Sequence, residues 1–207
     1  MTATPGNRKV EDRDTELIQA INAGGQHRFS ELVARYQGPL YNFGLRMCGS
    51  PNDVEDLIQE TFLNIFKYLP GFRFETKFKN WVYRIATSAC LKAKRKSKYA
   101  PERELSLDEF LPRGEDQIPS QIPDWAVKPL DQVLNRELAE MLKEAVLELP
   151  KKYRLVLVLR DMEGFSTAEA AEIMEISPAN VKVRLHRARL FLRDKLKDYF
   201  HDDPPQS

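Results

Sequence analysis

The chain has 207 residues, and its 32 Lys and Arg side chains almost balance 31 Asp and Glu side chains, for a formal net charge of +1. This length allows one or two small domains, while no apolar stretch approaches the roughly 20 residues that span a bilayer and the polar N-terminus lacks the features of a secretory signal. Cys48 and Cys90 form no CxxC pair, so we expect a cytoplasmic protein with no membrane insertion, disulfide framework, metal site or cofactor.

The sequence pattern of residues 1–99 predicts a helical domain. Residues 1–28 are interpreted as an N-terminal extension and the start of the first helix, and residues 29–99 as a helical bundle. Helical patterns run from Phe29 to Cys48, from 53 to 69 and from Lys79 to Lys96. Strand-type alternation over more than a few residues is absent, so the pattern indicates an all-α fold.

The helix predicted at 53–69 has clear signals at both ends. Ser50-Pro51-Asn52-Asp53 provides a cap residue, a proline at the first helical position and an acidic residue two positions later, and Pro70-Gly71 ends the pattern. Its apolar residues recur at steps of three and four, as in an amphipathic helix; they are Val54, Leu57, Ile58, Phe62, Ile65, Phe66 and Leu69.

Residues 72–84 combine five aromatic side chains with four cations. Such a mixture is typical of surfaces that bind single-stranded nucleic acid, because aromatic faces receive unstacked bases while cations follow the phosphates. A structural alternative is that Phe72, Phe78, Trp81 and Tyr83 pack the core of the bundle. The cations and Asn80 are harder to explain as core residues.

Residues 100–133 differ in composition from both flanks. They hold five of the thirteen prolines and eight acidic against three basic side chains, whereas residues 1–99 hold sixteen basic and ten acidic side chains. Proline and repelling like charges disfavour regular structure. We therefore predict a flexible Pro-rich acidic linker between two domains, and the near-neutral total charge is the result of cancellation.

The third part of the chain predicts a second small helical domain over 134–200, followed by a tail at 201–207. One helix is expected from about Asp131 to Leu149, and another opens at Pro150 and ends near Gly164. Proline at a helix start and glycine after a helix end are the usual signals.

The end of this domain has the layout of a helix-turn-helix. Ser166-Thr167-Ala168-Glu169 is a capping box that starts a helix of about two turns. After a short turn, Ser177-Pro178 opens a longer helix from Pro178 to Tyr199. Two helices joined by a turn of three or four residues form the helix-turn-helix motif.

The second helix of this pair is rich in cations. In a helix-turn-helix, the N-terminal part of the second helix enters the major groove of DNA. A simpler interpretation, a solvated basic face, would be preferred if the capped short helix did not precede it. The residues expected near bases and phosphates are Ala179, Asn180, Lys182, Val183, Arg184 and Arg187.

Three segments resemble conserved regions of bacterial RNA polymerase sigma factors. Asp53 to Phe62 resembles the second conserved region, and Phe78 to Ala86 resembles the segment that melts and reads the −10 promoter element. The stretch from Leu149 through Arg189 resembles the fourth region, which reads the −35 element. The likeness covers about 29–99 and 134–197, and with only these two domains the chain is similar to the small extracytoplasmic-function (ECF) group.

The resemblance implies partners and site residues. Core RNA polymerase would be bound through its β′ clamp helices and its β flap, promoter DNA would be the second partner, and an anti-sigma factor a third. The clamp-binding residues would be Asp53, Asp56, Gln59, Glu60 and Leu63. The −10 residues would be Phe72, Arg73, Phe74, Lys77, Lys79, Asn80, Trp81, Arg84, Ser88 and Lys92. The −35 residues would be Ser177, Ala179, Asn180, Lys182, Val183, Arg184 and Arg187.

Two positions depart from the family pattern. Phe74 stands where many relatives have glycine, which affects the loop conformation and base preference. Val183 stands where a hydroxyl residue is common; valine can contact a thymine methyl group but offers no hydrogen bond to phosphate.

The leading prediction is a non-enzymatic promoter-specificity subunit that recruits core polymerase and assists promoter opening. The alternative is an autonomous helix-turn-helix regulator that binds duplex operators without polymerase. An enzyme has little support, because the sequence contains no Gly-rich phosphate loop and no nucleophile elbow, and its histidines are only His27, His186 and His201.

Overall fold

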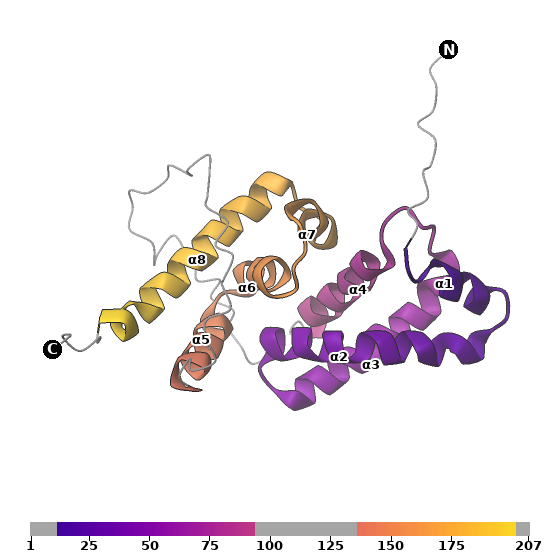
Figure 1. The fold of residues 1–207 in the computed structure, drawn as a ribbon, viewed down its shortest axis with the longest axis horizontal. Coiled ribbons are helices and arrows are strands. Elements are labelled where there is room, and N and C mark those ends of the chain that lie inside the picture. The colour runs from indigo at the N-terminus through magenta and orange to yellow at the C-terminus, as the bar shows by residue number, and fades with distance from the viewer. Residues whose placement is uncertain (1–11, 94–135, 202–207) are drawn as a thin grey trace, which may run out of the picture. The chain divides into compact units, whose positions relative to one another are not determined.

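A computed structural model describes residues 12–93 and 136–201, and all regular elements in these two ranges are helical (Figure 1). The prediction of an all-α protein is therefore confirmed for the described residues. The chain divides into two compact units, one formed mainly by residues before 94 and the other mainly by residues after 135. The predicted linker at 100–133 lies outside the described residues, as does the tail from 202 onward.

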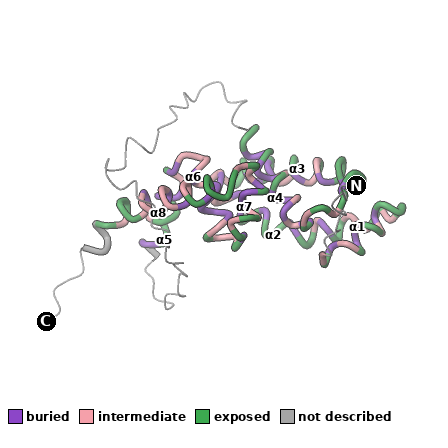
Figure 2. Tube along the Cα trace, turned by 90° about the horizontal axis from the view of Figure 1, so that it is seen from above, coloured by how far each residue is buried: buried purple, intermediate pink, exposed green. Residues whose placement is uncertain are grey.

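The first unit is a helical bundle, as the sequence predicts. Helices α2, α3 and α4 pack against one another in pairs, and each of them contains buried residues, which are purple along the tube in Figure 2. The elements of this unit are α1 (Thr15–Asn22), a 3-10 turn (Gln26–Arg28), α2 (Phe29–Cys48), α3 (Pro51–Tyr68), a 3-10 turn (Leu69–Gly71) and α4 (Phe78–Ala93).

Helices α2 and α3 approach each other closely at Gly44. A Cβ atom at this position would lie 2.9 Å from Val54 Cγ1, closer than real Cβ contacts, so any larger residue would require Val54 or the helix to shift. Gly49 then ends α2 in the left-handed conformation, and its N–H donates to the carbonyl oxygen of Leu45 at 2.9 Å. This is a common way to end a helix, and Pro51 starts the next helix two residues later as predicted.

Helix α1 is a feature that the sequence interpretation of 1–28 did not anticipate. Leu17, Ile18 and Ile21 are buried, and they follow the three-and-four spacing of a helix that packs on one face. The Asn22 side chain donates to the carbonyl oxygen of Leu69 at 3.4 Å. Residues from Asp12 onward are thus an integral part of the first unit.

The second unit is built around its last helix. Helices α5 and α6 both pack against α8. Pro150 precedes α6 and Gly164, with φ 72°, follows its extension, as the sequence predicts. The elements are α5 (Arg136–Glu148), α6 (Lys151–Leu157), a π-helical segment (Val158–Met162), α7 (Thr167–Met174) and α8 (Pro178–His201).

The helix-turn-helix has the caps that the sequence predicts. Ser166 N–H donates to Glu169 Oε2 at 2.9 Å, while Glu169 N–H donates to Ser166 Oγ at 3.2 Å, so the capping box is reciprocal. At the start of α8, Asn180 N–H donates to Ser177 Oγ at 3.2 Å. Because both helix starts are satisfied by neighbouring serines, the position of the turn is determined locally.

Candidate polymerase and nucleic-acid interfaces

One face of α3 carries the residues predicted to bind polymerase. The opposite face is buried through Val54, Leu57, Thr61 and Ile65, which leaves the predicted residues at the surface. All of them are exposed, and their spacing of three and four places most of them along one stripe; they are Asp53, Asp56, Gln59, Glu60 and Leu63.

The C-terminal part of this face is apolar, which the sequence pattern missed. Leu63 is 63% exposed, and Phe66 is 49% exposed although its spacing places it in the predicted buried stripe. The ring of Phe66 instead packs edge-on against Phe29, with 5.1 Å between ring centroids. Leu63 and Phe66 are three residues apart and therefore lie on the same side of α3.

The loop Phe72–Lys77 and the helix α4 form a cationic surface. Within residues 70–93 there are five cations and one acidic residue, Glu75. Arg73 and Lys77 are exposed in the loop, and on α4 exposed side chains recur every fourth residue at Arg84, Ser88 and Lys92. A spacing of four places these three on one helix face, as predicted for a surface that follows a DNA backbone.

Aromatic side chains fill the space beneath this surface. Phe72 is 8% exposed and packs against Phe74, Phe78 and Trp81, with ring centroids 4.9, 5.4 and 5.1 Å away. The ring of Phe72 therefore supports the loop in this conformation, and its expected contact with DNA stays a prediction. Phe78 and Tyr83 are buried, as the structural alternative expects.

The remaining −10 candidates lie around the start of α4. Trp81 is half-buried and stays available at the surface. Lys79 lies over the ring of Tyr83, at 5.7 Å from its centroid. Asn80 is 4% exposed, against the expectation that it is hard to explain as a core residue; its Nδ2 donates to Thr76 Oγ1 at 3.4 Å and so connects the helix to the loop before it. Phe74 has φ 59°, the left-handed conformation that favours glycine.

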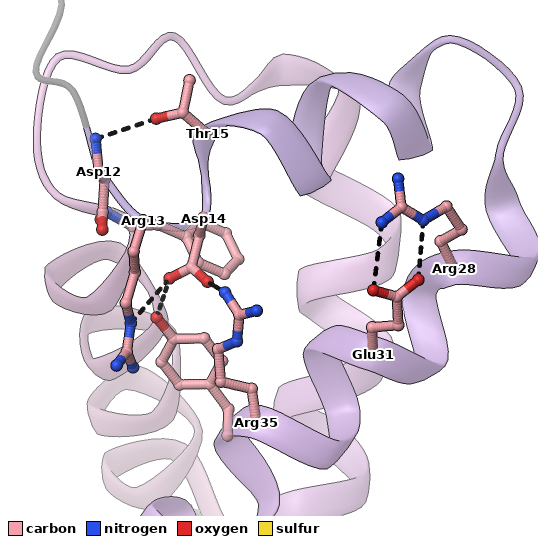
Figure 3. Close-up of polar contacts among 9 residues, drawn as sticks. Asp12, Arg13, Asp14, Thr15, Arg28, Glu31 and Arg35 are labelled. Atoms are coloured by element: carbon pink, nitrogen blue, oxygen red, sulfur yellow. Dashed lines mark hydrogen bonds and ion pairs between the residues drawn. The ribbon is translucent and has the colours of Figure 1, made fainter.

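A polar cluster at the N-terminal end of the first unit was missed by the sequence interpretation (Figure 3). The Asp14 side chain is completely buried, forms an ion pair with Arg35, and accepts a hydrogen bond from the hydroxyl of Tyr36. Arg13, which is largely exposed, lies 3.8 Å from the same carboxylate. A buried carboxylate with such partners satisfies the requirement that buried charges be paired.

The same cluster perturbs two titratable groups. Burial, followed by the hydrogen bond with Asp14, raises the pKa of Tyr36 above its ordinary value. Interaction with the Tyr36 hydroxyl raises the pKa of Arg13. At the surface nearby, Arg28 donates to both carboxylate oxygens of Glu31, which lowers the pKa of Glu31.

The N-terminal part of α8 carries the predicted −35 residues. Val181, Leu185 and Ala188 are buried and hold the helix in its unit. The predicted residues lie on the rest of the helix and on its cap: Ser177, Ala179, Asn180 and Lys182 are exposed, while Val183, Arg184 and Arg187 are half-buried. The Ser177 hydroxyl caps the helix, so this residue has a structural role besides the predicted one.

Arg189 lies two residues beyond Arg187 on α8 and forms an ion pair within the second unit. Its guanidinium group donates to both oxygens of Asp161, at 2.9 and 2.7 Å. The pair joins α8 to the π-helical segment within the second unit. Bidentate geometry makes this one of the stronger surface ion pairs.

Neither metal binding nor membrane insertion has support in the described part of the chain. Residues 12–93 and 136–201 contain no group of three His, Cys, Asp or Glu side chains that could hold a metal ion. None of the helices in these ranges has the length and apolarity needed to cross a bilayer.

Comparison with known proteins matches both units. The family described as sigma-70 region 2 matches residues 32–99, and the family described as sigma-70 region 4 matches residues 139–192. The two matches fall in the same order as the two resemblances in the sequence.

Two solved structures have a similar fold. One is the complex of CnrH with the cytosolic domain of CnrY, with a TM-score of 0.63 at 24% identity over 89% of this chain and 97% of that chain. The other is the sigma factor RpoE of Bartonella quintana in complex with the anti-sigma factor NepR. Its TM-score is 0.59 at 22% identity, over 82% of this chain and 96% of that chain.

Full-length relatives identify the group. The chain is 35% identical over 183 residues to the ECF RNA polymerase sigma factor SigW of Bacillus subtilis, and the aligned region covers 87% of this chain and 95% of that protein. It is 28% identical over 192 residues to the ECF RNA polymerase sigma-E factor of Haemophilus influenzae, with 89% and 95% covered. The chain therefore belongs to the ECF RNA polymerase sigma factors.

Proposed function

We propose that this ECF sigma factor acts as a promoter-specificity subunit: it binds core RNA polymerase, recognises −10 and −35 promoter elements, and assists promoter opening. Like its relatives, it is a non-enzymatic initiation factor. The observation that carries the proposal is the presence of two cationic surfaces of different kinds on two separate units. One combines cations with aromatic side chains, and the other is a capped recognition helix.

We assign core binding to the exposed face of α3. Asp53, Asp56 and Glu60 are suited to a basic partner, and Leu63 supplies an apolar contact. Surface ion pairs contribute only about 0–1 kcal/mol each, whereas complete burial of a leucine side chain contributes about 1.5–3 kcal/mol. We therefore expect Leu63 to contribute more affinity and the carboxylates to contribute more to orientation. The β′ clamp helices are the proposed partner of this face, and the β flap that of the second unit.

We assign −10 recognition to the loop Phe72–Lys77 and the exposed face of α4. An unstacked base needs a surface with apolar and cationic groups close together. Trp81 supplies the available aromatic face, while Arg73, Lys77 and Lys79 lie close to it in sequence on the loop and the start of α4. The buried rings of Phe72 and Phe78 lie beneath this surface and hold it in place.

We assign −35 recognition to the N-terminal turns of α8. Asn180 and Arg184 have side chains that can hydrogen-bond to base edges, and Lys182 can contact phosphate. Val183 can contact a thymine methyl group but has no donor for phosphate. The preferred −35 sequence is thus expected to include a thymine at the base pair that Val183 faces.

Two further assignments rest on the relatives. CnrH and RpoE were solved in complexes with CnrY and the anti-sigma factor NepR, and we propose that this chain too is regulated by an anti-sigma factor. Because the proposed partners are polymerase and the bacterial promoter, we propose that it acts in the cytoplasm.

Dependence on polymerase is the property that separates this function from the alternative. A sigma factor is expected to bind a promoter fragment specifically only with core polymerase, whereas an autonomous regulator binds it alone. The assay measures protection of promoter DNA by the chain with and without core enzyme. Equal, sequence-specific protection without core enzyme would favour the autonomous regulator.

Variants with matched controls test the three assignments. Asp56→Ala should weaken core binding, and Glu55→Ala, which changes another exposed acid of α3, should have a smaller effect. Arg184→Ala should reduce −35-dependent activity by about 1–3 kcal/mol if it contacts a base. Arg193→Ala, at an exposed position further along α8, serves as its control. An equal loss on every −35 sequence would assign Arg184 to phosphate.

A further inference from the structure

The backbone N–H of the first residue of α4 donates a hydrogen bond to a residue far away in the sequence. Phe78 N–H donates to Asp12 Oδ2 at 2.7 Å, across 66 positions. The first N–H groups of a helix have no intrahelical acceptor. Lys77 is at the capping position, and a lysine side chain contains no atom that can accept a hydrogen bond. The first turn of α4 contains no acidic residue. Asp12 therefore supplies a hydrogen-bond acceptor to this helix start.

The segment that carries Asp12 is itself fixed to the bundle. Asp12 N–H donates to Thr15 Oγ1 at 3.0 Å at the start of α1. Two residues on, the buried carboxylate of Asp14 is held by Arg35 and Tyr36 of α2 (Figure 3). The capping carboxylate thus directly precedes two anchored residues, Asp14 and Thr15, so its position relative to α4 is determined by α1 and α2.

An aromatic path connects the same anchors to the loop. The Tyr36 ring packs edge-on against Phe78, with 5.6 Å between ring centroids. Phe78 packs in turn against Phe72 at 5.4 Å and Trp81 at 5.5 Å, and Phe72 against Phe74 at 4.9 Å. Polar and aromatic contacts from the N-terminal segment therefore converge on Phe78, where the loop ends and α4 begins.

The loop has a conformation that needs such support. Phe74 has φ 59°, and a non-glycine residue keeps this unfavourable conformation only when its surroundings determine it. At the other end of the loop, Phe72 N–H donates to the carbonyl oxygen of Leu69 at 3.1 Å. The loop is thus held at both ends, by a local turn at Leu69 and by Asp12 at Phe78.

We propose that Asp12 is a positioning residue for −10 recognition: it holds the start of α4 and, through it, the loop Phe72–Lys77 in the conformation that reads the DNA. This inference rests on the proposed function of the loop. Asp12 acts as a hydrogen-bond acceptor, not through contact with DNA, where its negative charge would repel phosphate. When the charge is removed and the acceptor is kept, the positioning explanation predicts no change, whereas repulsion of phosphate by Asp12 predicts tighter DNA binding.

The test compares Asp12→Ala with Asp12→Asn in the full-length chain bound to core polymerase. Asparagine is as good a helix cap as aspartate, whereas alanine provides no acceptor. We expect Asp12→Ala to slow promoter opening about fivefold and to reduce discrimination against a mutated −10 element, while Asp12→Asn stays close to wild type. Core affinity and −35 discrimination should be unchanged. Glu16→Ala, at an exposed acid in the first turn of α1, is the control and should have no effect.

Amide hydrogen exchange in the free protein gives a second readout that does not depend on transcription. Asp12→Ala should increase exchange at Phe78 and in the loop, but not in the helices of the second unit. This measurement also detects general unfolding, which would increase exchange throughout the first unit.

Four results would overturn the inference. The first is that Asp12→Ala opens the promoter at the wild-type rate, and the second is that Asp12→Asn slows opening as much as Asp12→Ala does. The third is that Asp12→Ala slows opening equally on a template without a −10 element, and the fourth is that it leaves the exchange rate at Phe78 unchanged.

Two further variants, Lys79→Ala and Trp81→Ala, distinguish failure of this inference from failure of the proposed function. If these two variants discriminate −10 sequences as wild type does, the loop assignment itself is wrong. If they lose discrimination while Asp12→Ala keeps it, only the role of Asp12 is wrong.

Discussion

The left-handed conformation of Phe74 predicts an unusual order of stability among substitutions at this position. For an L-residue other than glycine this conformation costs about 1–2 kcal/mol. The Phe74 ring recovers part of this cost by packing on Phe72 at 4.9 Å, since aromatic pairs contribute about 0.5–1.5 kcal/mol beyond burial. Phe74→Gly loses the ring but also the backbone cost, so we expect its stability to lie within about 1 kcal/mol of wild type.

Alanine separates these two contributions. Phe74→Ala loses the ring and keeps the backbone cost, so it should be less stable than Phe74→Gly by about 1 kcal/mol. Arg73 is the matched control, because the described positive-φ residues other than glycine are Phe74 and Glu175. At Arg73 the order should be the usual one, with alanine at least as stable as glycine.

The assay is urea unfolding of the full-length chain followed by Trp81 fluorescence. The chain has two tryptophans, and a Trp125→Phe background makes Trp81 the single reporter. Trp81 belongs to the aromatic cluster under the loop, with its ring 5.1 Å from that of Phe72. A Phe74→Ala variant as stable as Phe74→Gly, or more stable, would refute the claim that the backbone is strained here.

Other predictions concern the polar contacts of both units. Asp14→Ala should cost about 3 kcal/mol in urea unfolding, because it leaves Arg35 and the buried Tyr36 hydroxyl without their partner; a loss below 1 kcal/mol would contradict the buried pair. The raised pKa of Tyr36 means that the folded state favours the protonated phenol, so stability should fall as pH rises above about 10. Tyr36→Phe should lack this component of the alkaline loss. Ser166→Ala should cost about 1 kcal/mol in a thermal melt, and no change would argue against the capping box. Asp161→Ala should destabilise the second unit by about 1 kcal/mol, and high salt should reduce the difference.

Local signals in the sequence were sufficient for much of the fold. Pro51, Pro150 and Pro178 each mark a helix start, and Ser166 with Glu169 predicts a cap that the structure forms reciprocally. These signals involve residues within four positions of each other. Their energies therefore depend little on the rest of the chain, which explains why the predicted starts agree with the structure.

Several of the features that the sequence interpretation missed depend on distant contacts. Asp12 acts on Phe78 across 66 positions, and no periodicity relates the two. Spacing placed Phe66 in a buried stripe, but the bundle leaves it 49% exposed, with its ring against Phe29. Phe72 was predicted to contact DNA through the family resemblance, yet it is 8% exposed. A motif gives residue types and order, but the packing of neighbouring rings decides which of them faces solvent.

Helix α1 could have been found from the sequence. Leu17, Ile18 and Ile21 have helical spacing, but the pattern is only eight residues long. Isolated helices of this length are marginal, so its stability comes from packing on the first unit. The assigned DNA and polymerase contacts, in contrast, stay predictions that need the partner molecules.

Promoter opening by defined components tests the central claim most directly. Core polymerase, the chain and a promoter fragment with a fluorescent base in the −10 element are mixed, and the unstacking of that base is followed. We expect opening only when core enzyme and the chain are both present, with a loss when either the −10 or the −35 element is changed. Opening by core enzyme alone at the same rate, or specific opening by the chain without core enzyme, would contradict the account.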